Sequence, residues 1–202
     1  MSNLGRIEIR RKRGDEKLKS GAQDLGCSVP DFWKWSASDL VSNATRGRLA
    51  EFIVAKALGM PVNTTVRDEW AEYDLAGPGG VKVEVKSAAF LQSWHQDRPS
   101  SIQFVVPKTR AWDPNTNVLS AEPKRQAEVY VFALLKEREN KDKLDPLDVD
   151  QWEFYVLPTA ILDARTRSQH SLTLKTLRDL TGGPVDYWHL AGRVASPATR
   201  EA

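Results

Sequence analysis

The sequence has few of the residues that build disulfides and zinc sites. Cys27 is the only cysteine among 202 residues, so the chain cannot form an internal disulfide. The three histidines, His95, His170 and His189, are scattered without the spacing of metal ligands. A cysteine-based zinc site is therefore not expected, and the chain should fold without covalent cross-links.

Long apolar runs and a large charge of one sign are absent as well. No run approaches the length of a membrane span, and the N-terminus lacks the basic-then-apolar layout of a signal peptide. These features predict a cytoplasmic protein that does not enter a membrane. The 29 basic residues nearly balance the 27 acidic ones, which gives a net charge of +2. A nucleic-acid-binding protein with this balance must concentrate its basic residues locally.

One such concentration lies in residues 1–28, which are predicted to form a basic arm. Its cations are Arg6, Arg10, Arg11, Lys12, Arg13, Lys17 and Lys19. Two interpretations stay open, contact with nucleic acid or a solvated, partly disordered arm. Residues 29–202 are predicted to form a single domain, onto which the aromatic residues of segment 31–35 should pack.

Hydrophobic periodicity predicts one helix, several strands and then further helices. The first helix follows Ser36 and Ser38 and ends before Gly59. The later elements are an extended piece at 70–76, a glycine turn at 77–80, strands at 81–86, 101–107, 128–135 and 152–157, and helices at about 158–164 and 171–180. This order favours an α/β (α+β) fold in which helices flank one sheet.

The strand at 81–86 alternates strictly between apolar and charged residues. Side chains two positions apart share one face of a strand, so Glu84 and Lys86 point together. Val81, Val83 and Val85 point to the other face and seat the strand on the core. A carboxylate and an amine are thereby held side by side on the face opposite the valines.

The register of the hairpin decides whether Asp74 joins this pair. If Ala76 paired with Val81, Asp74 would face the wrong side of the sheet. If Gly77 pairs with Val81, a three-residue loop of Pro-Gly-Gly connects the strands and Asp74 lies opposite Glu84. Such loops need a residue in the left-handed region, which glycine supplies. The sequence permits this second register.

Two neighbouring carboxylates repel each other and need a cation. Hard oxygen ligands in an open site suit Mg²⁺, which keeps several waters and binds phosphate oxygens. Lys86 can then either orient and help to deprotonate the attacking water, or stabilise the charge that grows on the phosphate. Both roles stay open at this stage.

Asp74 and Glu84-Val85-Lys86 on a hairpin, after a helix that carries Glu51, resemble the motif of the PD-(D/E)XK nuclease superfamily. The resemblance implies a restriction-endonuclease-like mixed sheet of about five strands. It also implies a metal-dependent nuclease, with DNA as the expected substrate and Mg²⁺ (or Mn²⁺ in its place) as cofactor. In that superfamily the Asp, the Glu and the carbonyl at the position of Val85 bind the metal, the Lys assists the water, and the helix Glu supports the metal shell. Tyr73 stands where the motif often has proline.

Glu51 has a position that fits this role. At 100° per residue it projects on the same side as four small or apolar residues, Gly47, Val54, Ala55 and Leu58. A carboxylate beside an apolar stripe is unfavourable unless a metal or a basic group binds it. The competing interpretation is an exposed Glu51 paired with Arg48.

A second segment repeats the spacing of the motif. Asp113 is followed by Glu122-Pro123-Lys124. Pro123 is incompatible with a regular central strand, and the residues around 115–117 favour a loop. The context of the first copy, rather than its spacing, therefore selects Asp74, Glu84 and Lys86.

Further residues near the motif are candidates for contacts with nucleic acid. They are Gln92, Trp94, Lys108, Arg110, Lys124 and Arg125. Trp94 can stack on a base, although core packing is its commoner use. The competing interpretation for each cation is an ordinary solvated charge.

Two other classes of function compete with the nuclease. A non-catalytic DNA-binding module would keep the fold without binding a metal. An assembly protein would use the seven tryptophans as interface anchors. Members of the superfamily often dimerise to cut two strands, so a homodimer is a further expectation from the resemblance.

Overall fold

The computed structural model describes residues 4–166 and 169–196, so the ends of the predicted arm and domain, 1–3 and 197–202, lie outside it. A four-stranded mixed sheet forms its centre, in the order β3-β4-β8-β9. These strands are β3 (Leu75–Ala76), β4 (Lys82–Ala89), β8 (Val129–Leu135) and β9 (Trp152–Pro158). β4 and β8 run parallel, and the other two pairs are antiparallel. The predicted α/β class is confirmed, with four strands in this sheet rather than about five.

Strand β8 is buried along its whole length, as its unbroken apolar sequence indicates. Its odd-numbered residues contribute to one hydrophobic core and its even-numbered ones to another. The predicted strand at 101–107 is shorter in the structure: β5 (Gln103–Val105) pairs with β10 (Ser171–Thr173) in a separate two-stranded sheet.

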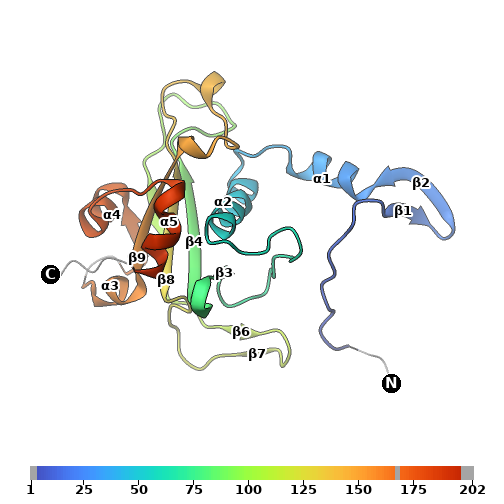
Figure 1. Ribbon diagram of the computed structural model, residues 1–202, viewed down its shortest axis with the longest axis horizontal. Coiled ribbons are helices and arrows are strands. Elements are labelled where there is room, and N and C mark those ends of the chain that lie inside the picture. The colour runs from blue at the N-terminus through green and yellow to red at the C-terminus, as the bar shows by residue number, and fades with distance from the viewer. Residues whose placement is uncertain (1–3, 167–168, 197–202) are drawn as a thin grey trace.

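Helices cover both faces of the central sheet (Figure 1). α2 (Asn43–Ala57) and α5 (Leu190–Ala195) pack on the face of Val83 and Val85. α3 (Thr159–Ala164) and α4 (Leu174–Thr181) cover the opposite face together with β5 and β10. None of the described helices is long and apolar enough to cross a membrane.

Helix α2 begins later than its sequence predicts. Asp39 accepts hydrogen bonds from the amides of Val41 and Ser42, at 3.1 and 3.0 Å, and this local turn competes with helix. Residues 39–42 are therefore a turn, and the expectation of helix there is wrong. At the other end, Gly59 takes the left-handed conformation, with φ of 72°, and stops the helix as predicted.

The N-terminal segment projects from the body of the molecule (Figure 1). It contains the hairpin β1 (Lys17–Ser20) and β2 (Gln23–Ser28), followed by α1 (Val29–Ala37). We expected the basic arm to be irregular, and this expectation is wrong for residues 17–28, which form a hairpin. Gly21 supplies the positive φ of its tight turn. The expectation that the aromatic residues of 31–35 pack on the domain is also wrong: α1 has no buried residue, and Trp35 is 85% exposed.

Several short elements complete the chain. A hairpin of β6 (Trp112–Asp113) and β7 (Val118–Leu119) contains Asp113, the first residue of the second copy of the motif spacing, and Asp113 is used there to hold a turn. Single 3-10 turns occur at Pro78–Gly80, Lys141–Lys143, Val149–Gln151 and Tyr187–His189. Asp113 is thus structural, which agrees with the choice of Asp74.

Candidate active site

The hairpin of β3 and β4 has the register that aligns the two carboxylates. Leu75 pairs with Val83, and the Gly77 amide donates to the Val81 carbonyl at 2.8 Å. One step further along the same register, Asp74 lies across from Glu84. The connecting Pro-Gly-Gly turn contains two glycines with φ of 71° and 81°, conformations that other residues adopt only with strain. The predicted register is confirmed.

The Asp74 carboxylate binds directly to the neighbouring strand. The Val85 amide donates to Asp74 Oδ2 at 2.8 Å, and the side chain of Asp74 is 19% exposed. Burial raises the pKa of Asp74, and the charge of Glu84 raises it further. Asp74 is thus held in position, and its ionised form is disfavoured until a cation arrives.

The Val85 carbonyl lies on the same side of β4 as Asp74. Alternate residues of a strand direct their backbone groups to alternate neighbours. The Lys82 carbonyl faces β8, since it accepts from the Glu128 amide at 2.8 Å. The backbone groups of Val83 and Val85 therefore face β3, whose first residue is Leu75. The Val85 carbonyl consequently points to an edge where no β3 residue pairs with it.

Glu84 and Lys86 form an ion pair on the opposite face from the valines. Lys86 Nζ lies 2.5 Å from Glu84 Oε1, and both side chains are partly exposed. Tyr130 pairs with Glu84 across β4 and β8 and is buried beside it. Burial, and after it the charge of Glu84, raises the pKa of Tyr130 to about 12, so its hydroxyl stays protonated at neutral pH.

Glu51 reaches this centre through a residue that the sequence did not indicate, Arg67. The Arg67 guanidinium binds both Glu51 oxygens through Nε and a terminal nitrogen, and it binds Glu69 at 2.5 Å. It also lies 3.9 Å from Asp74 Oδ1. Burial raises the pKa of Glu51, while its hydrogen bonds to Arg67 oppose that rise. Glu51 is therefore paired with Arg67, and not with Arg48 as the competing interpretation had it.

The donor set of this centre fits a hard divalent cation. Asp74 Oδ1, Glu84 and the Val85 carbonyl could serve as oxygen ligands at one edge of β4, where burial, and after it the charge of Glu84, raises the pKa of Asp74. Glu51 is already bound by Arg67. In residues 4–166 and 169–196, no group of three or more Asp, Glu, His or Cys side chains is gathered for a metal. The fit therefore rests on two carboxylates, one carbonyl and waters.

A cavity of about 420 Å³ adjoins the carboxylates. Arg67, Glu51 and Asp74 lie on its wall, and its other lining is largely apolar, with Phe52 and Met60 among the side chains. Asp74 and Glu51 are thus open to a ligand from the side of α2 and of the loop at 60–74, whereas Glu84 and Lys86 do not line this cavity.

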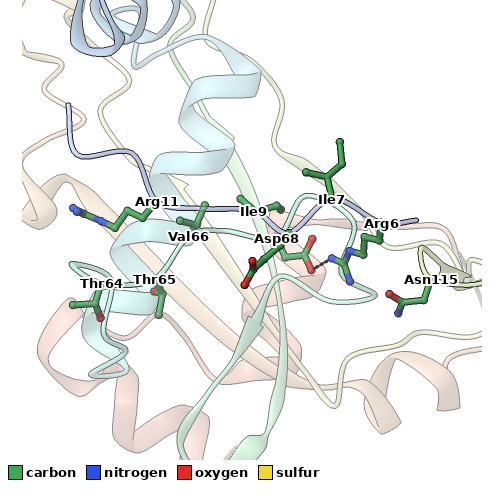
Figure 2. A pocket seen from close by; sticks show the side chains of 10 residues that line it. Arg6, Ile7, Ile9, Arg11, Thr64, Thr65, Val66, Asp68 and Asn115 are labelled. Carbon is green, nitrogen blue, oxygen red and sulfur yellow. Dashed lines mark hydrogen bonds and ion pairs between the residues drawn. The ribbon is translucent and has the colours of Figure 1, made fainter. Parts of the chain in front are cut away.

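The N-terminal segment runs beside the loop that carries Arg67 (Figure 2). Arg6 pairs with Asp68 at 2.5 Å, directly after Arg67 in the sequence. A groove of about 650 Å³ separates the two segments and is lined by Ile7, Arg11 and Thr64 among others. One arm cation is thus used to fix the loop of the candidate active site.

The predicted nucleic-acid contacts fall into two groups. Trp94 is 54% exposed rather than packed in the core, and Lys124 is exposed as well. Lys108 lies 3.6 Å from Asp163, and Arg110 donates to the Ser120 carbonyl at 2.5 Å. These four residues are accessible to a ligand.

Gln92 and Arg125 are buried and bound by protein groups, and their contact with nucleic acid stays a prediction. The Arg125 guanidinium binds Asp163 and the Val106 carbonyl, because a buried cation must be satisfied by protein groups. Gln92 accepts a hydrogen bond from Arg46 and donates to the Ala89 carbonyl. Both residues thus have structural partners.

Comparison with known proteins gives one family. The family model of bacteriophage T4 endonuclease IV matches residues 8–174, whereas no curated protein matches the chain. The match includes α2, the whole central sheet and the three residues Asp74, Glu84 and Lys86, and it ends at the first residue of α4. The chain therefore belongs to the bacteriophage T4 endonuclease IV family and is a nuclease, with nucleic acid as its substrate.

Proposed function

We propose that the chain is a Mg²⁺-dependent endonuclease of the PD-(D/E)XK type that hydrolyses phosphodiester bonds in DNA. The observation that carries this proposal is the hairpin register, which places Asp74 across from Glu84 with Lys86 Nζ 2.5 Å from the Glu84 carboxylate. Membership of a nuclease family argues against the alternative of a DNA-binding module without catalysis.

Each residue of the centre has a separate task in this proposal. Asp74, Glu84 and the Val85 carbonyl would hold the metal ion. When bound, Mg²⁺ (or Mn²⁺) supplies Lewis-acid polarisation of the phosphate and acidifies a water. Lys86 holds the attacking water beside Glu84, and Arg67 carries positive charge near Asp74 where the phosphate becomes more negative. Tyr130, which pairs with Glu84 across β4 and β8, forms the buried side of the site.

The direct test is cleavage of DNA by the purified protein. Wild type should cut with Mg²⁺ or Mn²⁺ and stop with EDTA, and an RNA of the same sequence serves as the alternative substrate. Lys86→Ala should lose about 10²–10⁴-fold in rate, the range for a positioned proton-transfer group. Lys82→Ala is the matched control. Lys82 lies on the same face of β4 as Lys86, one turn of the alternation beyond Glu84, and its ammonium lies over the Tyr73 ring.

Two results would count against the proposal. Equal residual activity in Lys86→Ala and Lys82→Ala would show that Lys86 has no part in the reaction. Undiminished cleavage in EDTA would show that the metal assignment is wrong. Calorimetry with Mn²⁺ gives a readout apart from activity: Glu84→Gln and Asp74→Asn should each weaken binding, and Lys82→Ala should not.

A further inference from the structure

Arg46 is a buried cation whose protein partners are all neutral. It lies in the first turn of α2 and is 4% exposed. Its guanidinium donates to the Val41 carbonyl at 2.7 Å, to Asn43 Oδ1 at 2.8 Å and to Gln92 Oε1 at 3.2 Å. Its Nε is buried without a hydrogen-bond partner. The nearest counter-charge that affects it, Asp39, acts only as a longer-range attraction.

This position is unfavourable for a positive charge in two ways. The N-terminus of a helix carries partial positive charge, so a cation in the first turn is repelled. Burial removes water from the guanidinium and lowers the pKa of Arg46. A buried charge without a counter-charge is costly, and an anion bound beside Arg46 would offset part of that cost.

Arg46 borders a polar cavity of about 290 Å³ at the carboxyl end of β4. The cavity is lined by polar groups from three segments, namely Asn43, Arg46, Ser87, Gln92, Ser100, Ser101 and Gln103. Hydroxyl and amide groups around a guanidinium are the donors that proteins use for phosphate oxygens. Gln92 holds the guanidinium through Oε1 while its amide nitrogen donates to the Ala89 carbonyl at 2.9 Å.

We propose that this cavity binds a phosphate group of the nucleic-acid strand, about three nucleotides from the reacting phosphate. The proposal rests on the proposed function for the identity of the strand. Ser87, in the cavity wall, directly follows Lys86 on β4. Strands rise about 3.3 Å per residue, so Ser87 lies about 10 Å from Glu84 along β4, and it points to the face of the valines, opposite Glu84. At about 3.4 Å per nucleotide, that distance corresponds to about three nucleotides. Arg46 would then fix the register of the strand in the active site.

The test measures binding of a fluorescently labelled DNA oligonucleotide in EDTA, across a series of salt concentrations. Arg46→Met keeps the length of the side chain and removes its charge. It should weaken binding and reduce the slope of log K against log salt by about 1, the effect of one lost phosphate contact. Arg46→Lys should retain most of that slope. Ser101 is exposed, so Ser101→Glu should fold normally and weaken binding by placing a negative charge at the cavity.

Arg193→Met is the matched control. Arg193 also has a buried Nε without a partner, but it lies on α5 and outside the cavity. Its loss should leave the salt slope unchanged. A second probe is inorganic phosphate at constant ionic strength, which should raise the Tm of wild type and not that of Arg46→Met.

Three outcomes would overturn the assignment. The first is a folded Arg46→Met variant with the wild-type salt slope. The second is full affinity in Ser101→Glu, which also decides the matter if Arg46→Met does not fold. The third is stabilisation by inorganic phosphate with an unchanged slope for DNA, which would assign the cavity to a free anion. None of these measurements involves cleavage, so failure of this proposal can be distinguished from failure of the proposed nuclease function.

Discussion

The Val85 amide donates its hydrogen bond to the side chain of Asp74, at 2.8 Å, where a regular sheet would offer a backbone carbonyl. Strand β3 begins at Leu75, one residue after Asp74, so the side-chain carboxylate of Asp74 takes the place of a β3 carbonyl in the pairing with β4. The same contact fixes one oxygen of Asp74 and leaves Oδ1 for other partners, of which Arg67 is 3.9 Å away. Strand pairing and the candidate metal site thus depend on one side chain.

Asp74→Asn should stabilise the metal-free protein at neutral pH while abolishing cleavage. Asparagine still accepts the bond from the Val85 amide and removes a carboxylate whose pKa is raised by burial and by Glu84. We expect an increase in Tm of a few degrees, which corresponds to about 1 kcal/mol in a chain of this size. Thermal melts in EDTA measure this, and a lower Tm than wild type would contradict it.

The difference in stability between Asp74→Asn and wild type should change with pH in a defined direction. Because the pKa of Asp74 is higher in the folded than in the unfolded state, its contribution to stability is present below its unfolded value of about 3.9 and is lost as the pH rises through the folded pKa. The advantage of Asp74→Asn should therefore be largest near pH 7 and vanish towards pH 4. Melts across this range provide the check, and a constant difference would contradict a raised pKa of Asp74 in the folded protein.

Arg67→Ala should reduce cleavage by about 10²–10³-fold, the usual effect of losing a donor to developing charge. It also leaves Glu51, Glu69 and Asp74 without their shared cation, so we expect a loss of about 1 kcal/mol in stability after allowance for solvent screening. Arg67→Lys should restore part of the cleavage rate and part of the stability. Arg48→Ala is the control, since Arg48 is exposed and its ion pair is with Glu69, at 3.9 Å. Single-turnover rates and urea melts measure the two effects, and equal rates for Arg67→Ala and Arg48→Ala would exclude a catalytic part for Arg67.

Two glycine substitutions should act in opposite directions. Gly79 has φ of 71° with open space around it, so Gly79→Ala meets no clash but strains the backbone, and should cost about 1 kcal/mol. Gly47 lies inside α2, also in open space, and Gly47→Ala should stabilise by about 0.5–1 kcal/mol. Urea unfolding compares them directly. The two variants changing stability in the same direction would contradict the role of the glycine turn in setting the register.

Arg125→Met should lower stability without changing the affinity for nucleic acid. Its fully buried guanidinium binds the Val106 and Gln169 carbonyls, and an unpaired buried acceptor costs about 1–3 kcal/mol. Arg110→Met, at an exposed residue, should leave stability within about 0.5 kcal/mol. Urea melts and anisotropy in EDTA separate the two effects. Weaker DNA binding by a fully folded Arg125→Met would support the sequence-based assignment of Arg125 to the nucleic-acid surface.

The hairpin could be predicted because its determinants are local. Alternation of the valines with Glu84 and Lys86 gives the face of each residue, and the Pro-Gly-Gly loop permits the register that the structure has. The central strands were also predictable, since β8 is an unbroken apolar run and β9 is apolar apart from Glu153. In each case the information lies within a few residues of the element itself.

Arg67 and Arg46 could not be found in this way. The main partner of Arg67 is Glu51, on α2, and Arg46 binds Gln92, far along the chain, so their significance exists only in the folded chain. Arg46 in particular looks like an ordinary surface cation of an amphipathic helix. Likewise, α1 was missed because its aromatic residues suggested a core, whereas they face solvent.

The parallel pairing of β4 with β8 has a consequence for how the molecule folds. Residues 90–128 separate the two strands, whereas Asp74 and Glu84 meet across a short turn. Long loops close slowly, so we expect the hairpin to form before β8 joins it. Mutations such as Leu75→Ala and Val131→Ala should then show high and low φ-values, respectively. The early step brings two negative charges together before the sheet supports them, and divalent ions should therefore accelerate folding as well as retard unfolding.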